Sequence, residues 1–393
     1  MAATSPPIGT TTTNLHVEAP PHSELIRVLC VYGTRPEAIK MAPVIRELQS
    51  RSDTFEALVC ATDQHRDIAD QVMGIFGVEP DLRLGIMRPD QSLQELTTRL
   101  LTGLGDVVGR VQPDWIVAQG DTTSVLAAAM TAFYARIPFA HVEAGLRTGD
   151  LSRPFPEEFN RVVADRVAAL KFAPTPRAAE ALRAEGHSDN SILMTGNTVI
   201  DAIHRVQATA YQWHDGPLAC LDRSNRIVLV TVHRRESFGS GLKSICLAVA
   251  TLAQRYPRVL FAFPVHPNPN VRQPAAELLA GLDNVFLLEP LDYLSFVHLM
   301  KTSILIITDS GGVQEEAPAF KVPVLVVREK TERPEGLELG LAKLVGVDTQ
   351  QIIDEGTRYL SEGGPPLQDF DNPYGDGQAA RRIVDALATR CTF

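Results

Sequence analysis

Short apolar runs alternate with longer amphipathic stretches along most of the chain. An apolar run that ends in a glycine or polar turn before a helical pattern is typical of a parallel α/β sheet. The pattern predicts strands at 27–32, 55–60, 115–118, 139–142, 171–173, 226–232, 259–265, 284–288, 304–308 and 322–327. It also predicts a helix that starts after Thr34 and ends near 49, and further helices at 92–109, 124–135 and 159–169.

The alternation is interrupted between 195 and 225, where Gly, Pro and Trp occur and no strong strand pattern is present. A chain of 393 residues is also longer than one hydrophobic core usually supports, so two domains are expected. We place a Rossmann-like domain at 25–195 and a second at 196–375. Residues 1–24 are rich in Thr, Pro, Ala and Ser and are predicted to be a disordered extension.

Composition narrows the class of protein. The net charge of −10 argues against a nucleic-acid-binding protein, although a nucleotide ligand needs only a few local cations. The five cysteines have no paired or metal-type spacing, and Cys30, Cys60 and Cys246 lie in apolar runs, as in a reduced, cytoplasmic protein. The start of the chain does not look like a signal peptide, and no run is apolar and long enough for a membrane helix.

Three carboxylates follow predicted strands of the first half. Asp121 comes after the strand at 115–118, Glu143 comes after the strand at 139–142, and Glu157 follows a Pro-rich turn. Because ligands of open α/β sheets bind beyond the carboxyl ends of the strands, these side chains suggest acid/base chemistry on a small molecule. Alternatively, Asp121 caps the next helix, and the two glutamates are solvated loop charges.

Candidate groups for binding an anion occur in both halves. Arg35 and Lys40 lie at a predicted helix start, where an anion can bind, although Lys40 could be a surface residue. His233 ends a strand of the second half, with a structurally satisfied histidine as the alternative. The turn at 309–312 matches neither a Walker loop nor a dinucleotide fingerprint, but its glycines allow close approach of a phosphate. No residue spacing resembles a metal site.

Eight motifs resemble one enzyme family. They are GTRPEAIKMAP (33–43), QGDTTS (119–124), HVEAGLRTGD (141–150), PFPEEFNR (154–161), HRRES (233–237), HPNPNVR (266–272), DSGGVQEEAP (309–318) and TERPE (331–335). In this order they resemble the bacterial UDP-N-acetylglucosamine 2-epimerases of the non-hydrolysing type, over about 27 to 385. Ser237 and Val232 depart from the family's usual residues, and we expect them to alter packing near His233 rather than the chemistry.

The resemblance implies two Rossmann-like domains in a GT-B-like arrangement, with the active site in the cleft between them. It implies that a C-terminal helix within 376–393 crosses back to the first domain, that the enzyme is a homodimer, and that it uses no metal and no redox cofactor. The implied catalytic residues are Asp121, Glu143, Glu157 and His233. The implied substrate-binding residues are Arg35, Lys40, His233, Phe296, Ser310, Gly311, Gly312, Glu316 and Arg333, with Glu316 on the ribose and Phe296 near the uracil.

The implied reaction is the reversible conversion of UDP-GlcNAc to UDP-ManNAc. UDP is eliminated to give a 2-acetamidoglucal and is then added back, and the product supplies ManNAc units for cell-surface polysaccharide. The resemblance also implies a second, activating UDP-GlcNAc near Gln64, His65 and Arg66. The order in which the carboxylates act on the two faces of C2 stays open.

Other functions remain open at this level. A hydrolysing epimerase would release ManNAc and UDP, and a GT-B glycosyltransferase would need an acceptor pocket. A sugar-nucleotide sensor would normally have lost some of the carboxylates. A relative that acts on a 3-acetamido uronic acid form of the nucleotide sugar would carry similar motifs.

Overall fold

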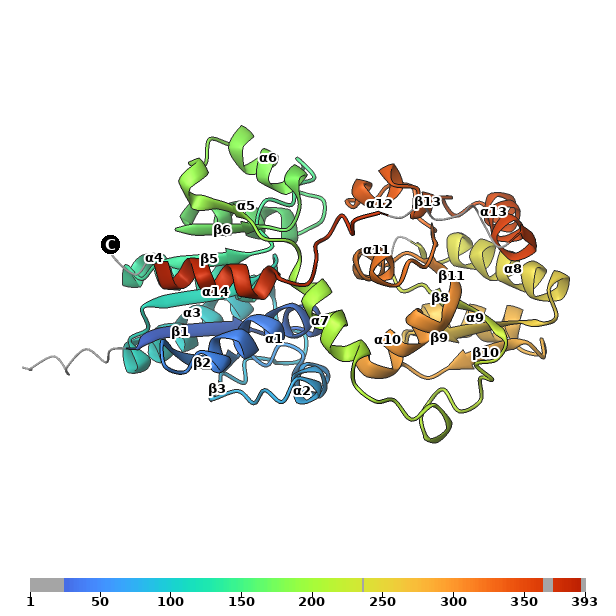
Figure 1. The fold of residues 1–393 in the computed structure, drawn as a ribbon, viewed down its shortest axis with the longest axis horizontal. Helices are drawn as coiled ribbons and strands as arrows, with labels where there is room; N and C mark the ends of the chain where they lie inside the picture. Colours follow the sequence, from blue (N-terminus) through green and yellow to red (C-terminus); the bar gives the residue numbers. More distant parts are fainter. Residues whose placement is uncertain (1–24, 235–236, 363–369, 390–393) are drawn as a thin grey trace, which may run out of the picture.

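The computed structural model describes residues 25–234, 237–362 and 370–389. The predicted extension at 1–24 and the last residues of the predicted segment 376–393 lie outside these ranges. Two α/β units lie side by side (Figure 1), each built on one sheet. We call the part that contains β1 to β7 the first unit and the part that contains β8 to β13 the second unit.

Both sheets are parallel throughout the strand pairs that the structure describes. The first has the order β3-β2-β1-β4-β5-β6-β7 and the second the order β10-β9-β8-β11-β12-β13. Their strands are β1 (Ile26–Tyr32), β2 (Phe55–Ala61), β3 (Leu82–Arg83), β4 (Trp115–Gln119), β5 (Phe139–Val142), β6 (Leu170–Ala173), β7 (Ile192–Met194), β8 (Arg226–Thr231), β9 (Val259–Pro264), β10 (Val285–Leu288), β11 (Ser303–Thr308), β12 (Val324–Val326) and β13 (Ala342–Leu344). The predicted fold of two Rossmann-like units is confirmed.

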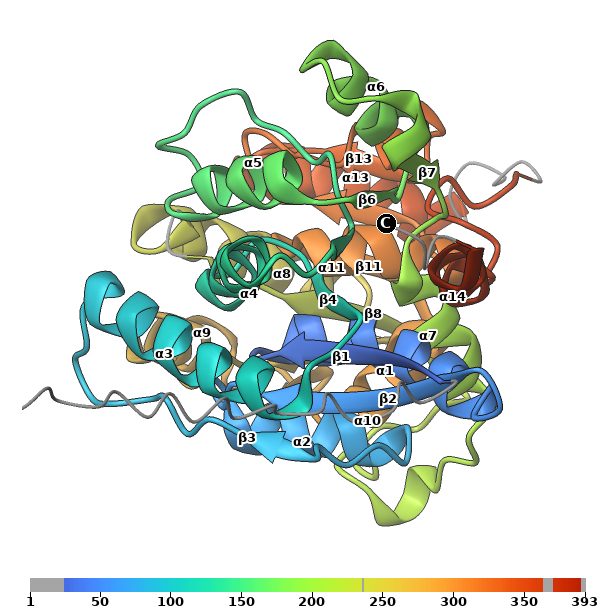
Figure 2. The same cartoon turned by 90° about the vertical axis from the view of Figure 1, so that its left-hand side faces the viewer.

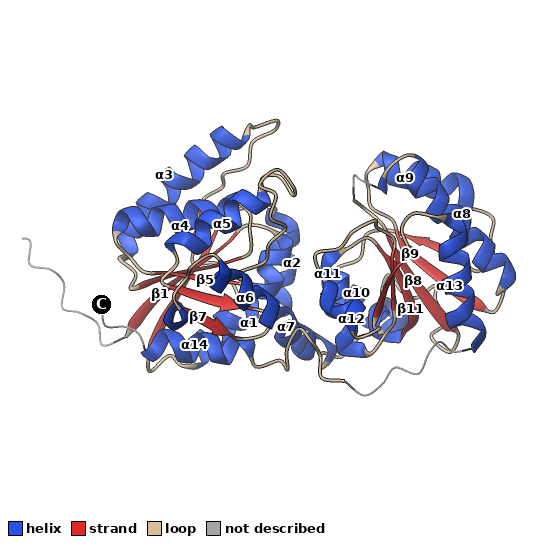
Figure 3. Cartoon of the chain, turned by 90° about the horizontal axis from the view of Figure 1, so that it is seen from above, coloured by secondary structure: helices blue, strands red, loops and turns tan. Residues whose placement is uncertain are grey.

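Helices cover both faces of each sheet (Figure 3). In the first unit they are α1 (Arg35–Ser50), α2 (Arg66–Ile75), α3 (Leu93–Val111), α4 (Thr123–Ala135), α5 (Glu157–Val167), α6 (Pro176–Ala184) and α7 (Thr198–Gln207). They continue with α8 (Ser240–Arg255), α9 (Pro269–Leu279), α10 (Tyr293–Thr302), α11 (Gly311–Glu316), α12 (Pro334–Glu338), α13 (Thr349–Glu362) and α14 (Ala379–Thr389). No helix within the described ranges combines the length and the apolar character needed to span a bilayer.

The strands predicted from apolar runs are present, but three short edge strands were missed. They are β3, β7 and β13, each of two or three residues. Each of these strands has a hydrogen-bonded neighbour on one side only, and each contains exposed or half-buried residues. Such a strand does not need the continuous apolar run that marks a central strand buried on both faces. Helix α5 also begins two residues earlier than predicted, at Glu157.

Alternate residues of the central strands pack on opposite faces of the sheet. Val28 and Cys30 of β1 belong to a core formed with α1, α7 and α14, whereas Leu29 and Val31 belong to a core formed with α3 and α4. All four side chains are inaccessible or nearly so. Both faces of β1 are therefore shielded from solvent, which explains its uninterrupted apolar sequence.

The chain crosses between the units and then returns. Helix α7 lies within the predicted junction, between the two units (Figure 1). Helix α14 packs against α1 and α7 of the first unit, as Figure 2 shows from a second direction. Tyr293 and Val297 of α10 join the same core as α7, so this core links the two units.

Candidate functional site

A cavity of about 570 Å³ lies between the carboxyl ends of the two sheets. It is lined by every residue that the sequence predicted for catalysis and substrate binding: Arg35, Lys40, Asp121, Glu143, Glu157, His233, Phe296, Ser310, Gly311, Gly312, Glu316 and Arg333. Gln64, His65 and Arg66 are not among the described residues that line it. They lie at the start of α2, whose first residue is Arg66, and Oε1 of Gln64 accepts a hydrogen bond from the hydroxyl of Ser124 at 3.2 Å.

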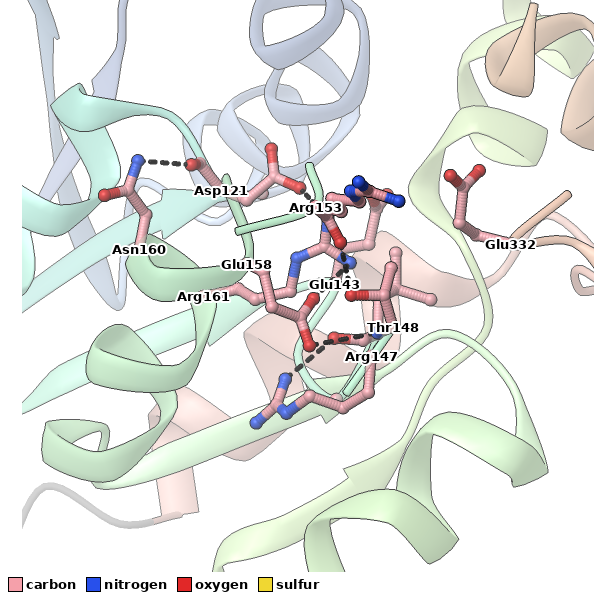
Figure 4. A network of polar contacts seen from close by, with 12 residues as sticks. Asp121, Glu143, Arg147, Thr148, Arg153, Glu158, Asn160, Arg161 and Glu332 are labelled. Carbon is pink, nitrogen blue, oxygen red and sulfur yellow. Dashed lines mark hydrogen bonds and ion pairs between the residues drawn. The ribbon is translucent and has the colours of Figure 1, made fainter. Parts of the chain in front are cut away.

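Asp121 faces the cavity and does not cap a helix. The N-cap of α4 is Thr122, whose hydroxyl accepts a hydrogen bond from the backbone of Val125. The carboxylate of Asp121 lies 2.8 Å from Nη2 of Arg161. Nδ2 of Asn160 donates to the backbone carbonyl of Asp121 at 2.8 Å (Figure 4). Two residues of α5 therefore fix the direction of Asp121.

The side chain of Glu143 is only 9% exposed, and its backbone lies in the left-handed region, with φ of 66°. Its carboxylate pairs with Nζ of Lys40, which also lies 2.9 Å from the carboxylate of Glu315 on α11. Burial raises the pKa of Glu143, and Lys40 offsets only part of this effect. The alternatives of a solvated loop carboxylate and a surface lysine are therefore wrong for Glu143 and Lys40.

The adjacent glutamates at the start of α5 have different roles. Glu157 is partly accessible and lines the cavity. Glu158 is buried, and its Oε1 accepts hydrogen bonds from the backbone N–H groups of Thr148 and Gly149 at 3.0 and 2.9 Å (Figure 4). Glu158 therefore holds the preceding loop, while Glu157 is available to a ligand.

Glu37 is a buried carboxylate of the cavity wall that the sequence analysis did not assign. It accepts hydrogen bonds from the backbone of Gly33 and Thr34 at 2.9 and 2.6 Å and from the hydroxyl of Thr122 at 2.5 Å. Burial raises its pKa, and these donors offset part of the increase. It joins the turn that carries Arg35 to the turn that carries Asp121. The capping-box pattern from Thr34 to Glu37 was the available signal.

In the second unit, Asp309 organises the turn that carries His233. It follows β11, is fully buried, and accepts hydrogen bonds from the backbone N–H groups of His233 and Arg234 at 3.1 and 2.9 Å. The hydroxyl of Ser237 donates to the same carboxylate at 3.0 Å, so this departure from the family pattern makes a contact. Residues 235–236 of the motif lie outside the described residues.

The ring of His233 is partly accessible, and its Nδ1 lies 3.4 Å from Asp309. Burial lowers the pKa of His233, and Asp309 offsets only part of this effect. Its ring stacks near that of His266, with 6.2 Å between the ring centres. A neutral imidazole at the edge of the cavity is therefore favoured near neutral pH.

Helix α11 places Glu315 and Glu316 in the cavity wall, where both side chains are buried. Nε and Nη2 of Arg333 each lie 2.8 Å from Oε1 of Glu315. Burial would raise the pKa of Glu315, but Lys40 and Arg333 outweigh it and lower the pKa to about 2. Burial raises the pKa of Glu316 to about 7, although the hydroxyl of Tyr293 donates to it at 3.1 Å.

Arg333 packs directly over Gly311. A Cβ atom on Gly311 would lie 3.2 Å from Cζ of Arg333, which is closer than side chains normally approach. Glycine at this position therefore permits Arg333 to reach Glu315. Phe296 of α10 also lines the cavity and is partly buried.

Among the residues that the structure describes, no group of three or more His, Cys, Asp or Glu side chains is placed to hold a metal ion. Several charged groups of the cavity instead pair with one another, among them Lys40 with Glu143 and Glu315, and Arg333 with Glu315. The cavity therefore offers carboxylates on the side of the first unit and hydroxyl, glycine and arginine groups on the side of the second.

Comparison with known proteins gives a consistent result. A family model described as UDP-N-acetylglucosamine 2-epimerase matches residues 46–388. The UDP-N-acetylglucosamine 2-epimerase of Yersinia pestis is 48% identical over 370 residues, which cover 92% of this chain and 98% of the relative.

Solved structures agree with these matches. The crystal structure of UDP-GlcNAc 2-epimerase from Neisseria meningitidis bound to UDP-GlcNAc is similar with a TM-score of 0.87 and 44% identity, covering 93% of this chain and 100% of that chain. The structure of the Methanocaldococcus jannaschii enzyme with UDP-GlcNAc and UDP has a TM-score of 0.79 and 32% identity, with the same coverage of 93% and 100%. The GT-B-like arrangement predicted for this chain is confirmed.

Proposed function

The chain belongs to the UDP-N-acetylglucosamine 2-epimerase family, and we propose from this premise that it interconverts UDP-GlcNAc and UDP-ManNAc without releasing free sugar. The observation that carries the proposal is the composition of the cavity. Asp121, Glu143 and Glu157 of the first unit face the nucleotide-binding candidates of the second unit across one cavity. Such a cavity can hold a diphosphate at one wall and a sugar ring against carboxylates at the other.

The proposed reaction proceeds by elimination and re-addition. The bond between C1 and the UDP oxygen breaks with its electron pair leaving on UDP. A carboxylate then takes the C2 proton, and the C–H electron pair forms the C1–C2 double bond of a 2-acetamidoglucal. A proton returns to C2 on the opposite face, and the UDP oxygen attacks C1. Carboxylates near C2 are suitable for both proton transfers.

The first wall has the features that this chemistry needs. Glu143 is desolvated, which raises its pKa and makes its protonated form easier to reach than in an exposed carboxyl group. Asp121 instead forms an ion pair with Arg161. Carboxyl groups with such different surroundings are suited to divide acid and base roles. Glu157 supplies a third group at the same wall.

We further propose that the second unit binds UDP. Ser310, Gly311 and Gly312 would contact the phosphates, and Glu316 would contact the ribose hydroxyls. Phe296 would lie near the uracil. His233, Arg35, Lys40 and Arg333 would neutralise the departing diphosphate, since cations and hydrogen-bond donors stabilise charge that develops on a leaving group.

Three additional features follow from family membership as proposals. The protein would form a homodimer, and a second UDP-GlcNAc would bind near Gln64, His65 and Arg66 as an activator. The surface of His65 is largely exposed, but desolvation by the neighbouring protein lowers its pKa, which favours the neutral ring. The product would serve the synthesis of ManNAc-containing cell-surface polysaccharide.

Proton NMR of UDP-GlcNAc and enzyme in D₂O tests the proposal in one measurement. We expect UDP-ManNAc to appear, with deuterium at C2 of both epimers and the sugars still attached to UDP. Free ManNAc as the main product would identify a hydrolysing epimerase. Unchanged UDP-GlcNAc without deuterium would contradict the proposed epimerase activity.

A further inference from the structure

A fully buried pair of polar side chains lies behind the cavity wall of the first unit. His141 of β5 and Asp165 of α5 are both inaccessible to solvent. Nδ1 of His141 lies 2.6 Å from Oδ1 of Asp165, and its Nε2 lies 2.7 Å from the carbonyl oxygen of Gly120. Neither side chain lines the cavity, so neither can touch a substrate there.

This pair connects the three segments that carry the candidate carboxylates. Gly120 immediately precedes Asp121. His141 lies two residues before Glu143, and Oδ2 of Asp165 accepts a hydrogen bond from the backbone N–H of Gly145 at 3.1 Å. Asp165 also belongs to α5, whose first residue is Glu157. The hydrogen bonds of this buried pair therefore connect the backbone segments that carry all three carboxylates.

The turn that carries Glu143 needs such support. Glu143 has φ of 66° and Gly145 has φ of 88°, both in the left-handed region. A non-glycine residue in that region is strained and persists only when its surroundings fix it. The turn has little room to shift, because a Cβ on Gly145 would lie 2.3 Å from the carbonyl oxygen of Ala178. The hydrogen bond to Asp165 is part of what holds it.

The hydrogen-bond partners define the protonation of the pair. A backbone carbonyl can only accept, so Nε2 of His141 must donate to Gly120. Asp165 also accepts from the N–H groups of Gly145 and Arg147, the latter at 2.8 Å, as an ionised carboxylate does. Arg147, whose guanidinium is always charged, independently favours this ionised form. Nδ1 of His141 must therefore donate as well, and the ring carries two protons.

The carboxylate of Asp165 is bound from two sides, by His141 and by Arg147. Arg147 binds Asp165 with one nitrogen and Glu185 with two, at 2.6 and 2.8 Å. Lys171 of β6 also lies close enough to Asp165 to interact with it electrostatically. Desolvation can cancel the Coulombic gain of a buried ion pair, so these contacts are not explained by stability alone. The pair is well suited to fix a site.

We propose that His141 is a buried imidazolium that acts through Asp165 as a positioning residue for Asp121, Glu143 and Glu157. The role rests on the proposed epimerase function, whereas the protonation of His141 does not. Displacing a reacting group by about 1 Å can reduce the rate on the order of 10²-fold. Binding of UDP should change little, because the candidate nucleotide contacts of the second unit lie outside this cluster.

The variant Asp165→Asn tests the role, because the amide keeps the size of the side chain but removes its charge. We expect kcat to fall by about 10-fold or more, with the Kd for UDP within about two-fold of the wild-type value. The matched control is Asp201→Asn. Asp201 is a mostly buried carboxylate that accepts backbone N–H groups of Ala379 and Ala380, at the start of α14. The Asp201→Asn substitution should lower the melting temperature without changing kcat.

A folded Asp165→Asn enzyme with wild-type kcat would overturn the positioning role, even if its melting temperature fell. The protonation is tested separately by ¹⁵N NMR of the wild-type enzyme with labelled histidine, using His141→Gln to assign the signals. We expect two protonated, imidazolium-type nitrogens at neutral pH. An unprotonated nitrogen on His141 would overturn that part. This measurement needs no catalytic activity, so its failure is distinct from a failure of the proposed function, which the D₂O experiment on the wild-type enzyme reports.

Discussion

The two walls of the cavity are built alike but hold their charges differently. Each wall is the carboxyl end of a parallel sheet with helices on both faces. In the first wall, Asp121 pairs with Arg161 within the same unit. In the second wall, Glu315 pairs with Lys40 of the opposite unit as well as with Arg333 of its own. The first wall is therefore tied to its own scaffold, while the second has a buried charge contact that depends on how the units meet.

This difference suggests a division of labour. Proton transfer requires carboxylates that stay within a fraction of an ångström of their working positions. Nucleotide binding and release require two units that can separate, and closure over the ligand excludes water. A rigid first wall and a second wall connected to it through Lys40 satisfy both requirements. Four sets of substitutions test the comparison, in order of decreasing expected effect.

The largest effect should come from the first wall. Asp121→Asn, Glu143→Gln and Glu157→Gln each remove a proton-transfer group but keep the size of the side chain. We expect each to lower kcat by about 10²-fold or more and to leave the Kd for UDP almost unchanged. Initial rates and calorimetric UDP titrations measure both quantities. Glu56→Gln on β2, which pairs with Arg27 away from the cavity, is the control. Wild-type rates in all three variants would contradict the assignment of catalysis to this wall.

A smaller effect is expected from the contact between the walls. In Glu315→Gln the neutral amide can no longer neutralise both Lys40 and Arg333, so the closed arrangement should be less favoured. We expect a few-fold rise in the ratio of released UDP to UDP-ManNAc formed. Small-angle scattering should also show that UDP compacts the variant less than the wild-type protein. If the release ratio and the scattering curves match those of the wild type, closure does not depend on Glu315.

A third test uses the pH dependence of stability. The pKa of Glu316 is raised from 4.5 to about 7, so the folded state holds this proton more tightly than the unfolded state. Its contribution to the free energy of unfolding is therefore most favourable below about pH 4.5 and falls as the pH rises through about 7. In Glu316→Gln the amide side chain does not titrate, so its contribution to the free energy of unfolding does not fall as the pH rises.

We therefore expect the melting temperature of Glu316→Gln, relative to wild type and without UDP, to increase between pH 5 and pH 8. The wild type is the reference at each pH, because most other titrating groups are common to both proteins. A difference that is constant across this range would show that the carboxyl group of Glu316 titrates normally.

The smallest effect should come from an exposed ion pair between the units. Arg177 of α6 and Glu338 of α12 lie 2.6 Å apart, and their side chains are 57% and 61% exposed. Water and salt screen such a pair, so Glu338→Gln should change the free energy of unfolding by less than about 0.5 kcal/mol. Its UDP release ratio should equal that of the wild type, which makes it a matched control for Glu315→Gln. A clear rise in this ratio would mean that surface contacts help to control closure.

The sequence by itself determined the two-unit α/β fold and the positions of most central strands. Strands that are covered on both faces need continuous apolar runs, and these are visible without a structure. It also placed the candidate carboxylates together, because the carboxyl ends of neighbouring parallel strands meet at one edge of the sheet. The start of α1 was readable for a similar local reason, since Thr34, Pro36 and Glu37 satisfy its first N–H groups within a few residues.

Only the tertiary structure decided which charges pair and which face the ligand. Glu157 and Glu158 are indistinguishable in sequence, but the loop at Thr148 and Gly149 binds only the second of them. Glu315 meets Lys40, and His141 meets Asp165, because separate elements bring them together in space. Their protonation depends on burial and on partners distant in the chain. Sequence patterns report local backbone requirements and alternating burial, whereas charge pairing depends on distances that exist only after the chain has folded.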